Sequence, residues 1–144
     1  MANHFELAIT PWGTIGGGAL TGKYLVDDDK SPKRIKEGSA RLNERNTAIT
    51  KEVKKIIDET GIPGSIIALN WVRHKKGLFI PIVGSRTDIQ LVENMKCVDI
   101  KLSDDIMKRL DEVSSIEYGF PHDFLLSAPM TQNGYSGMKD RIVK

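Results

Sequence analysis

Two apolar runs set the tightest limit on what this chain can fold into. The run LAITPW at residues 7–12 is stopped by Pro11 and by the glycines that follow, and the run LFIPIVGS at residues 78–85 is apolar at nearly every position. Short apolar runs bounded by Gly and Pro are typical of strands, and this composition indicates burial on both faces. Because helical patterns separate the runs, we expect two parallel strands joined by a helical crossover, in an α/β fold.

Four helices are predicted between and after these strands. Ile49 and Val53 begin an apolar pattern of helical spacing, and Gly61 suits the left-handed turn that ends a helix. Thr87 with Gln90 three residues later has the spacing of a capping box, so a helix is expected to begin there. The other predicted segments are a long loop over residues 23–46, a helix opened by residues 63–65 and ended by Gly77, a helix begun at Ser103, and an irregular tail from residue 117.

The number of strands limits the fold further. A sheet of two parallel strands, each apolar on both faces, cannot cover itself, and its open edges can pair with other chains. We therefore expect the last portion of a larger sheet structure, with an edge that allows association with another chain. The 144 residues suffice for one core, which we place at residues 1–125, followed by an irregular tail at residues 126–144.

Composition argues against several classes of partner. A net charge of +2, from 21 basic and 19 acidic side chains, is too close to balance to predict binding to nucleic acid or membrane. No apolar run approaches the roughly 20 residues that cross a bilayer. Cys97 is the only cysteine, which excludes an internal disulfide and agrees with a cytoplasmic setting. We expect its thiol to be a small buried hydrophobe.

The stretch GGALTGKY at residues 17–24 raises the question of phosphate binding. Its glycines and Lys23 have the spacing of a P-loop, but Tyr24 stands where a P-loop places a Ser or Thr hydroxyl on Mg²⁺. A tyrosine hydroxyl lies a full ring further out, so the sequence argues against a magnesium-dependent NTPase and predicts no metal site. The glycines indicate either backbone that approaches a ligand closely or a flexible surface loop.

The two strands and their loops together resemble the aldo-keto reductase family. PWGTIGGGALTGKY resembles the loop after the seventh strand of these enzymes, and IPIVGSRTDIQLVEN resembles their eighth strand and the helix behind it. The match covers residues 3–125, and the closing IEYGFPHDFL looks like the fungal aryl-alcohol dehydrogenase branch. The resemblance implies the C-terminal portion, with the last two strands and flanking helices, of a TIM-type (β/α)8 barrel that reduces aldehydes or ketones with NADPH.

In such barrels, ligands bind at the loops that follow the strands, which is where both motifs fall. By resemblance, Trp12 stacks on the nicotinamide ring, with packing at the barrel rim as its alternative role. The pyrophosphate is expected to lie along the glycine loop, because a Cβ would hold the backbone away from the phosphates. The residues assigned to it are Gly13, Ile15 and Gly17 through backbone groups and Lys23 through charge.

The second loop is assigned to the adenosine end of NADPH. The guanidinium of Arg86 suits the 2′-phosphate, because it matches phosphate oxygens bidentately. Many family members carry Lys at the position of Gly84 and Arg at that of Gln90, so a preference for NADPH over NADH rests mainly on Arg86. Arg41 is matched to a phosphate-contacting arginine of the long loop. The other residues assigned to this end are Gly84, Ser85, Gln90, Glu93 and Asn94, with helix capping as the alternative for Gln90 and a solvated helix face for Glu93.

No catalytic residue is predicted. The family's catalytic tyrosine, lysine, aspartate and histidine lie on strands before the seventh, and His4, His74 and His122 fall at positions unsuited to replace them. We therefore expect an NADP-dependent oxidoreductase by family, acting on a small aldehyde or alcohol, that is truncated and inactive alone. The alternative is a non-catalytic NADP(H)-binding or regulatory module that pairs with a longer reductase.

Overall fold

The computed structural model describes residues 1–25, 35–36, 38–134, 136, 138 and 141. The chain divides into two compact units, Met1–Ser114 and Ser115–Lys144. The boundary that we place between residues 125 and 126 stays a prediction, and the long loop predicted over residues 23–46 lies outside the described residues at 26–34 and 37. None of the helices in the described part of the chain combines the length and the apolar character that a membrane crossing needs.

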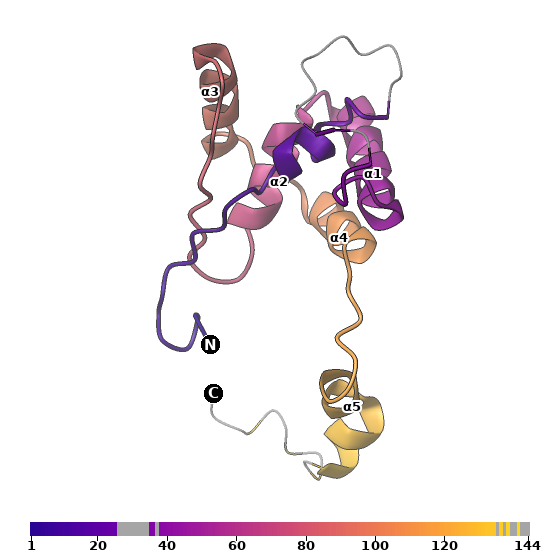
Figure 1. The fold of residues 1–144 in the computed structure, drawn as a ribbon. Helices are drawn as coiled ribbons and strands as arrows, with labels where there is room; N and C mark the ends of the chain where they lie inside the picture. The colour runs from indigo at the N-terminus through magenta and orange to yellow at the C-terminus, as the bar shows by residue number, and fades with distance from the viewer. Residues whose placement is uncertain (26–34, 37, 135, 137, 139–140, 142–144) are drawn as a thin grey trace. The chain divides into compact units, whose positions relative to one another are not determined.

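Four α-helices of the described residues lie in the unit Met1–Ser114, and local capping chemistry sets their ends (Figure 1). The Asn43 side chain accepts a hydrogen bond from the Asn46 backbone, and Gly61 closes the first helix at a φ of 71°, as predicted. Thr87 and Ser103 cap two later helices in the same way, which confirms both predicted starts. The helices are α1 (Glu44–Thr60), α2 (Gly64–Arg73), α3 (Asp88–Met95) and α4 (Asp104–Val113).

Helix α2 ends at Arg73 rather than just before Gly77, so the predicted end of this helix is wrong. The His74 backbone N–H already makes the closing bonds, and the turn that follows carries Lys75 to a carboxylate of α4, Asp111. At the other end, a Cβ on Gly64 would lie 2.9 Å from the backbone oxygen of Leu20. Glycine therefore allows the glycine loop to approach the start of α2 closely.

A first core cluster lies between α1, α2 and α4, which pack together in Figure 1. Fully burying one aliphatic side chain stabilises the folded chain by roughly 1.5–3 kcal/mol, so this cluster is the main apolar support of the three helices. Its buried residues are Val53, Ile56, Ile67, Leu102, Ile106 and Leu110.

A charged cluster fastens α4 to α1. Arg109 of α4 donates to Glu52 at 2.8 Å and to the two carboxylate oxygens of Glu59 at 2.7 and 3.0 Å. Hydrogen bonds from Lys55 and Arg109 lower the pKa of the Glu52 carboxyl, and the hydrogen bond from Arg109 lowers that of Glu59. Both carboxylates therefore favour their charged form in the folded chain.

The two predicted strands pair in parallel but remain very short. Isolated parallel bridges join Ile9 to Phe79 and Trp12 to Ile82, and no regular strand is found in the described part of the chain. Pro11 lacks the N–H that would continue the ladder between the two bridges, so the pairing is interrupted there. The parallel direction is confirmed, whereas the prediction of two regular strands is wrong.

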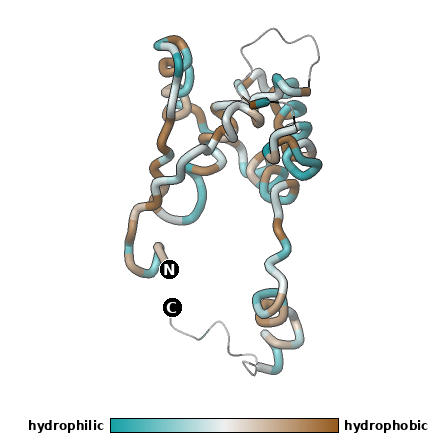
Figure 2. Tube along the Cα trace, viewed as in Figure 1, coloured by the Kyte–Doolittle hydropathy of each residue, from teal (hydrophilic) through white to brown (hydrophobic). Residues whose placement is uncertain are grey.

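One face of this pair packs on a second core cluster and the other is open. The packed face meets Ile66, Leu69 and the buried Cys97, as expected for this thiol. Leu78, Ile80 and Ile82 lie on the other face and are 60%, 51% and 52% exposed. The predicted burial on both faces is therefore wrong for the described residues, because no further element covers the second face. Figure 2 shows apolar stretches along the extended segment that leads into α3.

The unit Ser115–Lys144 contains α5 (His122–Leu126) and a short π-helix, η3 (Met130–Gly134). The tail expected to be irregular from residue 117 thus includes two short helical segments. The Phe120 and Phe124 ring centroids lie 6.1 Å apart, and those of Tyr118 and His122 lie 5.9 Å apart. Residues 135, 137, 139–140 and 142–144 lie outside the described part.

We predict that the cluster around Arg109 stabilises the folded chain only while its carboxylates are charged. The pKa values of Glu52 and Glu59 are lowered from the ordinary value of 4.5, so their contribution is present above that pH and is lost as the pH falls below it. Arg109→Gln should lower the denaturant midpoint near neutral pH, and the difference from wild type should shrink in acid. Lys108→Gln on the same helix, whose pair with Glu112 is exposed, is the control and should change little. An Arg109→Gln deficit that stays constant as the pH is lowered through the acid range would contradict this account.

Candidate functional site

Backbone hydrogen bonds bring the ends of the two predicted strands together. The Ile9 N–H donates to the Leu78 carbonyl at 2.8 Å, and the Ile80 N–H donates to the Ile9 carbonyl at 2.8 Å. The Ile82 N–H donates to the Pro11 carbonyl at 3.0 Å. Because the two segments run in the same direction, the chain leaves both of them at the same end. The glycine loop and the Gly-Ser-Arg run, which follow these segments, therefore lie at one end of the pair.

The glycine loop forms a compact turn, η1 (Gly16–Thr21). Gly16, Gly17 and Gly18 have φ values of +61°, +68° and +93°, which side chains with a Cβ rarely adopt. The Gly16 and Gly18 amides donate to the carbonyls of Gly13 and Ile15 at 2.8 and 3.0 Å. The Ile15 side chain packs on the second core cluster. The glycines are thus needed for the backbone path itself, and the loop is anchored on the core.

Two cationic side chains lie against this turn. A Cβ on Gly17 would lie 2.8 Å from an Nη atom of Arg41, and a Cβ on Gly18 would lie 3.2 Å from Nζ of Lys23. The guanidinium and the ammonium therefore approach the loop backbone closely. Positive charge beside a glycine-rich turn is an arrangement that suits an anion such as a phosphate group.

The Tyr24 hydroxyl has a structural partner. Its oxygen accepts a hydrogen bond from the Ile35 backbone at 2.8 Å, and Nζ of Lys23 lies 5.5 Å from the centroid of its ring. Tyr24 therefore connects the end of the glycine loop to Ile35, which is buried. In the described part of the chain, no group of three or more His, Cys, Asp or Glu side chains is placed to hold a metal ion.

The second loop is shaped by side chains that were assigned to the adenosine end. Asn94 is buried, and its Nδ2 donates to Oγ of Ser85 at 3.3 Å. Oε1 of Gln90 accepts from the Arg86 backbone N–H at 3.1 Å, one residue before the cap residue Thr87, so this side chain holds the loop that precedes α3. The Arg86 side chain is exposed at the start of α3, and nothing lies within 4 Å of a Cβ on Gly84. This leaves open space around Gly84 beside an accessible guanidinium.

These residues fit the anionic groups of a dinucleotide. Lys23 and Arg41 supply charge at the first loop, and Arg86 supplies it at the second. Trp12 is 75% exposed where the first segment ends, so its ring is accessible for stacking. The individual contacts assigned to Trp12 and to the two loops, and the role of the half-buried Glu93, stay predictions.

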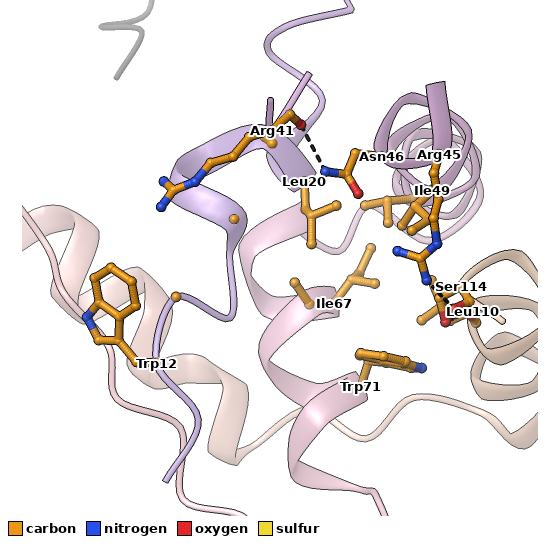
Figure 3. A pocket seen from close by; sticks show the side chains of 15 residues that line it. Trp12, Leu20, Arg41, Arg45, Asn46, Ile49, Ile67, Trp71, Leu110 and Ser114 are labelled. Atoms are coloured by element: carbon orange, nitrogen blue, oxygen red, sulfur yellow. Dashed lines mark hydrogen bonds between the residues drawn. The ribbon is translucent and has the colours of Figure 1, made fainter. Parts of the chain in front are cut away.

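A cavity of about 390 Å³ lies beside the glycine loop, among η1, α1, α2 and α4 (Figure 3). Sequence reasoning missed it, because its lining comes from four separate elements. The i, i+4 spacing of Ile67 and Trp71 on α2 was the available signal, but the same spacing is typical of ordinary core packing. Residues that line the cavity include Leu20, Arg41, Arg45, Asn46, Ile49, Ile67, Trp71, Leu110 and Ser114.

Comparison with known proteins agrees with the arrangement of the two loops. The model of the Aldo/keto reductase family matches residues 1–115, most of the chain. The chain therefore belongs to the aldo/keto reductase family. This is a family of oxidoreductases whose members generally use NAD(P)H and whose fold is a (β/α)8 barrel.

The relatives include fungal proteins named as aryl-alcohol dehydrogenases and as norsolorinic acid reductases. The "Probable aryl-alcohol dehydrogenase AAD4" of Saccharomyces cerevisiae is 29% identical over 90% of this chain and 40% of its own length. The "Putative aryl-alcohol dehydrogenase AAD15" of the same yeast is 31% identical over 92% of this chain and 95% of its own length. The "Norsolorinic acid reductase stcV" of Emericella nidulans is 27% identical over 85% of this chain and 30% of its own length. The chain thus spans less than half the length of several curated relatives and nearly all of another.

Proposed function

We propose that this chain is the NADP(H)-binding C-terminal portion of an aldo/keto reductase barrel, in which its two loops hold one dinucleotide. The observation that carries the proposal is the parallel pairing of residues 9–12 with residues 79–82, which puts the glycine loop and Arg86 at one end. Family membership supports the barrel and the class of cofactor. The cationic side chains beside the two loops support a ligand with phosphate groups.

Each loop has a distinct task in this proposal. Lys23 and Arg41 would balance the pyrophosphate charge, and Arg86 would bind the 2′-phosphate that distinguishes NADPH from NADH. The exposed ring of Trp12 would cover the nicotinamide, which supplies a hydride when the cofactor is bound. Gln90 and Asn94 would act through the loop, because their hydrogen bonds to the Arg86 backbone and to Ser85 hold its shape.

Arg86→Ala should weaken NADPH binding by about 1.5–3 kcal/mol, because it removes a charge-assisted contact with the 2′-phosphate. NADH, which lacks that phosphate, should bind wild type and variant alike. Calorimetric titration of the 144-residue chain with each nucleotide measures both effects. Lys96→Ala, which removes an exposed positive charge just after α3, is the matched control and should leave NADPH affinity unchanged. Equal affinity of Arg86→Ala and wild type for NADPH would contradict the proposal.

We place the reducing chemistry in a complete barrel rather than in this chain alone. The chain corresponds to 40% of the length of AAD4, and the resemblance puts the catalytic tyrosine, lysine, aspartate and histidine in the remaining part. The names of the relatives favour an aryl alcohol and its aldehyde as the substrate pair of the complete enzyme.

The chain by itself should not oxidise NADPH in the presence of an aryl aldehyde such as benzaldehyde. The reason is that the resemblance puts the general acid that protonates the carbonyl oxygen outside this chain. The loss of NADPH absorbance over time measures the reaction, with an active aldo/keto reductase as the positive control. Turnover that scales with the concentration of this chain and survives repeated purification would contradict the assignment of the reducing chemistry to a complete barrel.

A second candidate function is that of a non-catalytic module that pairs with a longer reductase. The open face and edges of the strand pair favour it. Successive backbone groups of an extended segment alternate between its two edges. Ile9 and Pro11 face residues 78–82, so the N–H groups of Ala8, Thr10 and Trp12 face the other edge. No described residue forms a bridge along that edge, which can accept a strand from another chain.

Thr10→Pro should abolish association through this edge, because it removes an outward N–H without touching the inward ones. Thr10→Val keeps the N–H and is the matched control. Capture of the chain by tagged AAD4, followed by sedimentation of the mixture, measures the association. Equal capture of Thr10→Pro and Thr10→Val would show that the edge is not the contact.

A further inference from the structure

We infer that the cavity beside the glycine loop is a separate binding site for a small aromatic carboxylate. Its volume of about 390 Å³ falls in the range of roughly 300–1,000 Å³ that is usual for small-molecule sites. Trp12, Gly13, Gly16 and Arg41 border it on the side of the dinucleotide loops, whereas most of its lining comes from helices with no role in the proposed cofactor site. Arg45 and Trp71, on which the inference rests, have no part in the proposed dinucleotide site, so the two sites can be tested separately.

The apolar part of the cavity suits a planar ring. Figure 3 shows the Trp71 indole along one side of the cavity, near Ile67, with Leu20 and Ile49 beyond it. The indole is held in place, because its Nε1 donates to Asp111 at 2.6 Å and Nζ of Lys75 lies 4.2 Å from its ring centroid. A fixed indole among aliphatic side chains favours stacking with an aromatic partner over contact with a flexible alkyl chain.

The polar part of the cavity suits an anion. Arg45 donates to the Ser114 carbonyl at 2.5 Å, which fixes its guanidinium on the lining and uses one of its five N–H donors. None of the ion pairs formed among the described residues involves Arg45 or Arg41. Asn46 also lines the cavity, and its Nδ2 donates to the Arg41 carbonyl at 3.0 Å (Figure 3). The lining thus offers the guanidinium of Arg45, which no carboxylate of the described residues neutralises, whereas the Arg41 guanidinium lies against Gly17 of the glycine loop.

The apolar walls around Trp71 and the guanidinium of Arg45 together favour an aromatic carboxylate as the ligand. A guanidinium donates two parallel hydrogen bonds to a carboxylate, and the apolar walls beside it exclude water from the attached ring. A neutral aromatic alcohol would fill the walls and leave the charge of Arg45 unmatched. An alkyl carboxylate would match the charge and lose the stacking on Trp71.

The test is a calorimetric titration of the 144-residue chain with 2-naphthoate, 2-naphthylmethanol and decanoate. We expect 2-naphthoate to bind one site and to bind at least roughly tenfold more tightly than the alcohol, as a charge-assisted contact implies. We expect decanoate to bind more weakly than 2-naphthoate. Tighter binding of decanoate, or equal binding of 2-naphthoate and 2-naphthylmethanol, would overturn the inference.

Two variants locate the binding in this cavity. Arg45→Gln should remove the preference for 2-naphthoate over the alcohol, whereas Lys51→Gln, an equal charge change on an exposed position of the same helix, should preserve it. Ala68 lines the cavity, and Ala68→Leu should fill part of it and abolish naphthoate binding while leaving a cooperative thermal melt. A folded Ala68→Leu variant that binds naphthoate as tightly as wild type would overturn the assignment.

The same variants separate this inference from the dinucleotide proposal. Arg45→Gln should leave NADPH affinity unchanged, and Arg86→Ala should leave naphthoate affinity unchanged. Loss of NADPH binding alone would therefore count against the proposed function without touching the cavity. Failure of naphthoate binding alone would contradict the proposed carboxylate site in the cavity and would not affect the proposed dinucleotide site.

Discussion

The hydrogen bonds between residues 9–11 and 78–82 are the constraint on which the rest of the structure depends. A parallel pair needs a crossover, and here α1 and α2 provide it. The crossover carries the chain back beneath η1, which rests on both helices because Gly64 allows close backbone contact. The turn is thereby fixed on a helical base at the same end of the pair as Arg86. One backbone pairing thus arranges both loops.

Features decided by neighbouring residues could be predicted from the sequence. Thr87, Ser103 and Gly61 act on the helix ends beside them, so their capping roles follow from residue type and spacing. The parallel direction follows from the helices between the two runs. Strand length could not be predicted, because it depends on neighbours that the local pattern does not specify and on the missing N–H of Pro11.

In the candidate site, too, the features set by neighbouring residues were predictable and those set by distant residues were not. The positions of the glycines predict the tight turn, because residues with a Cβ rarely adopt its φ values. The bonds from the Arg86 backbone to Gln90 and from Asn94 to Ser85 were less predictable, because an amide that can contact a ligand can equally hold its own loop. The cavity beyond the loop could not be predicted, since it arises only when four elements pack around Trp71.

The proline within the second segment has a consequence for assembly. The backbone of Pro81 faces away from residues 9–11, and it has no hydrogen to donate at the centre of that outer edge. Only the opposite edge of the pair carries a full row of donors. The missing donor of Pro81 therefore makes this outer edge a poorer acceptor of a further strand than the edge formed by residues 8–12.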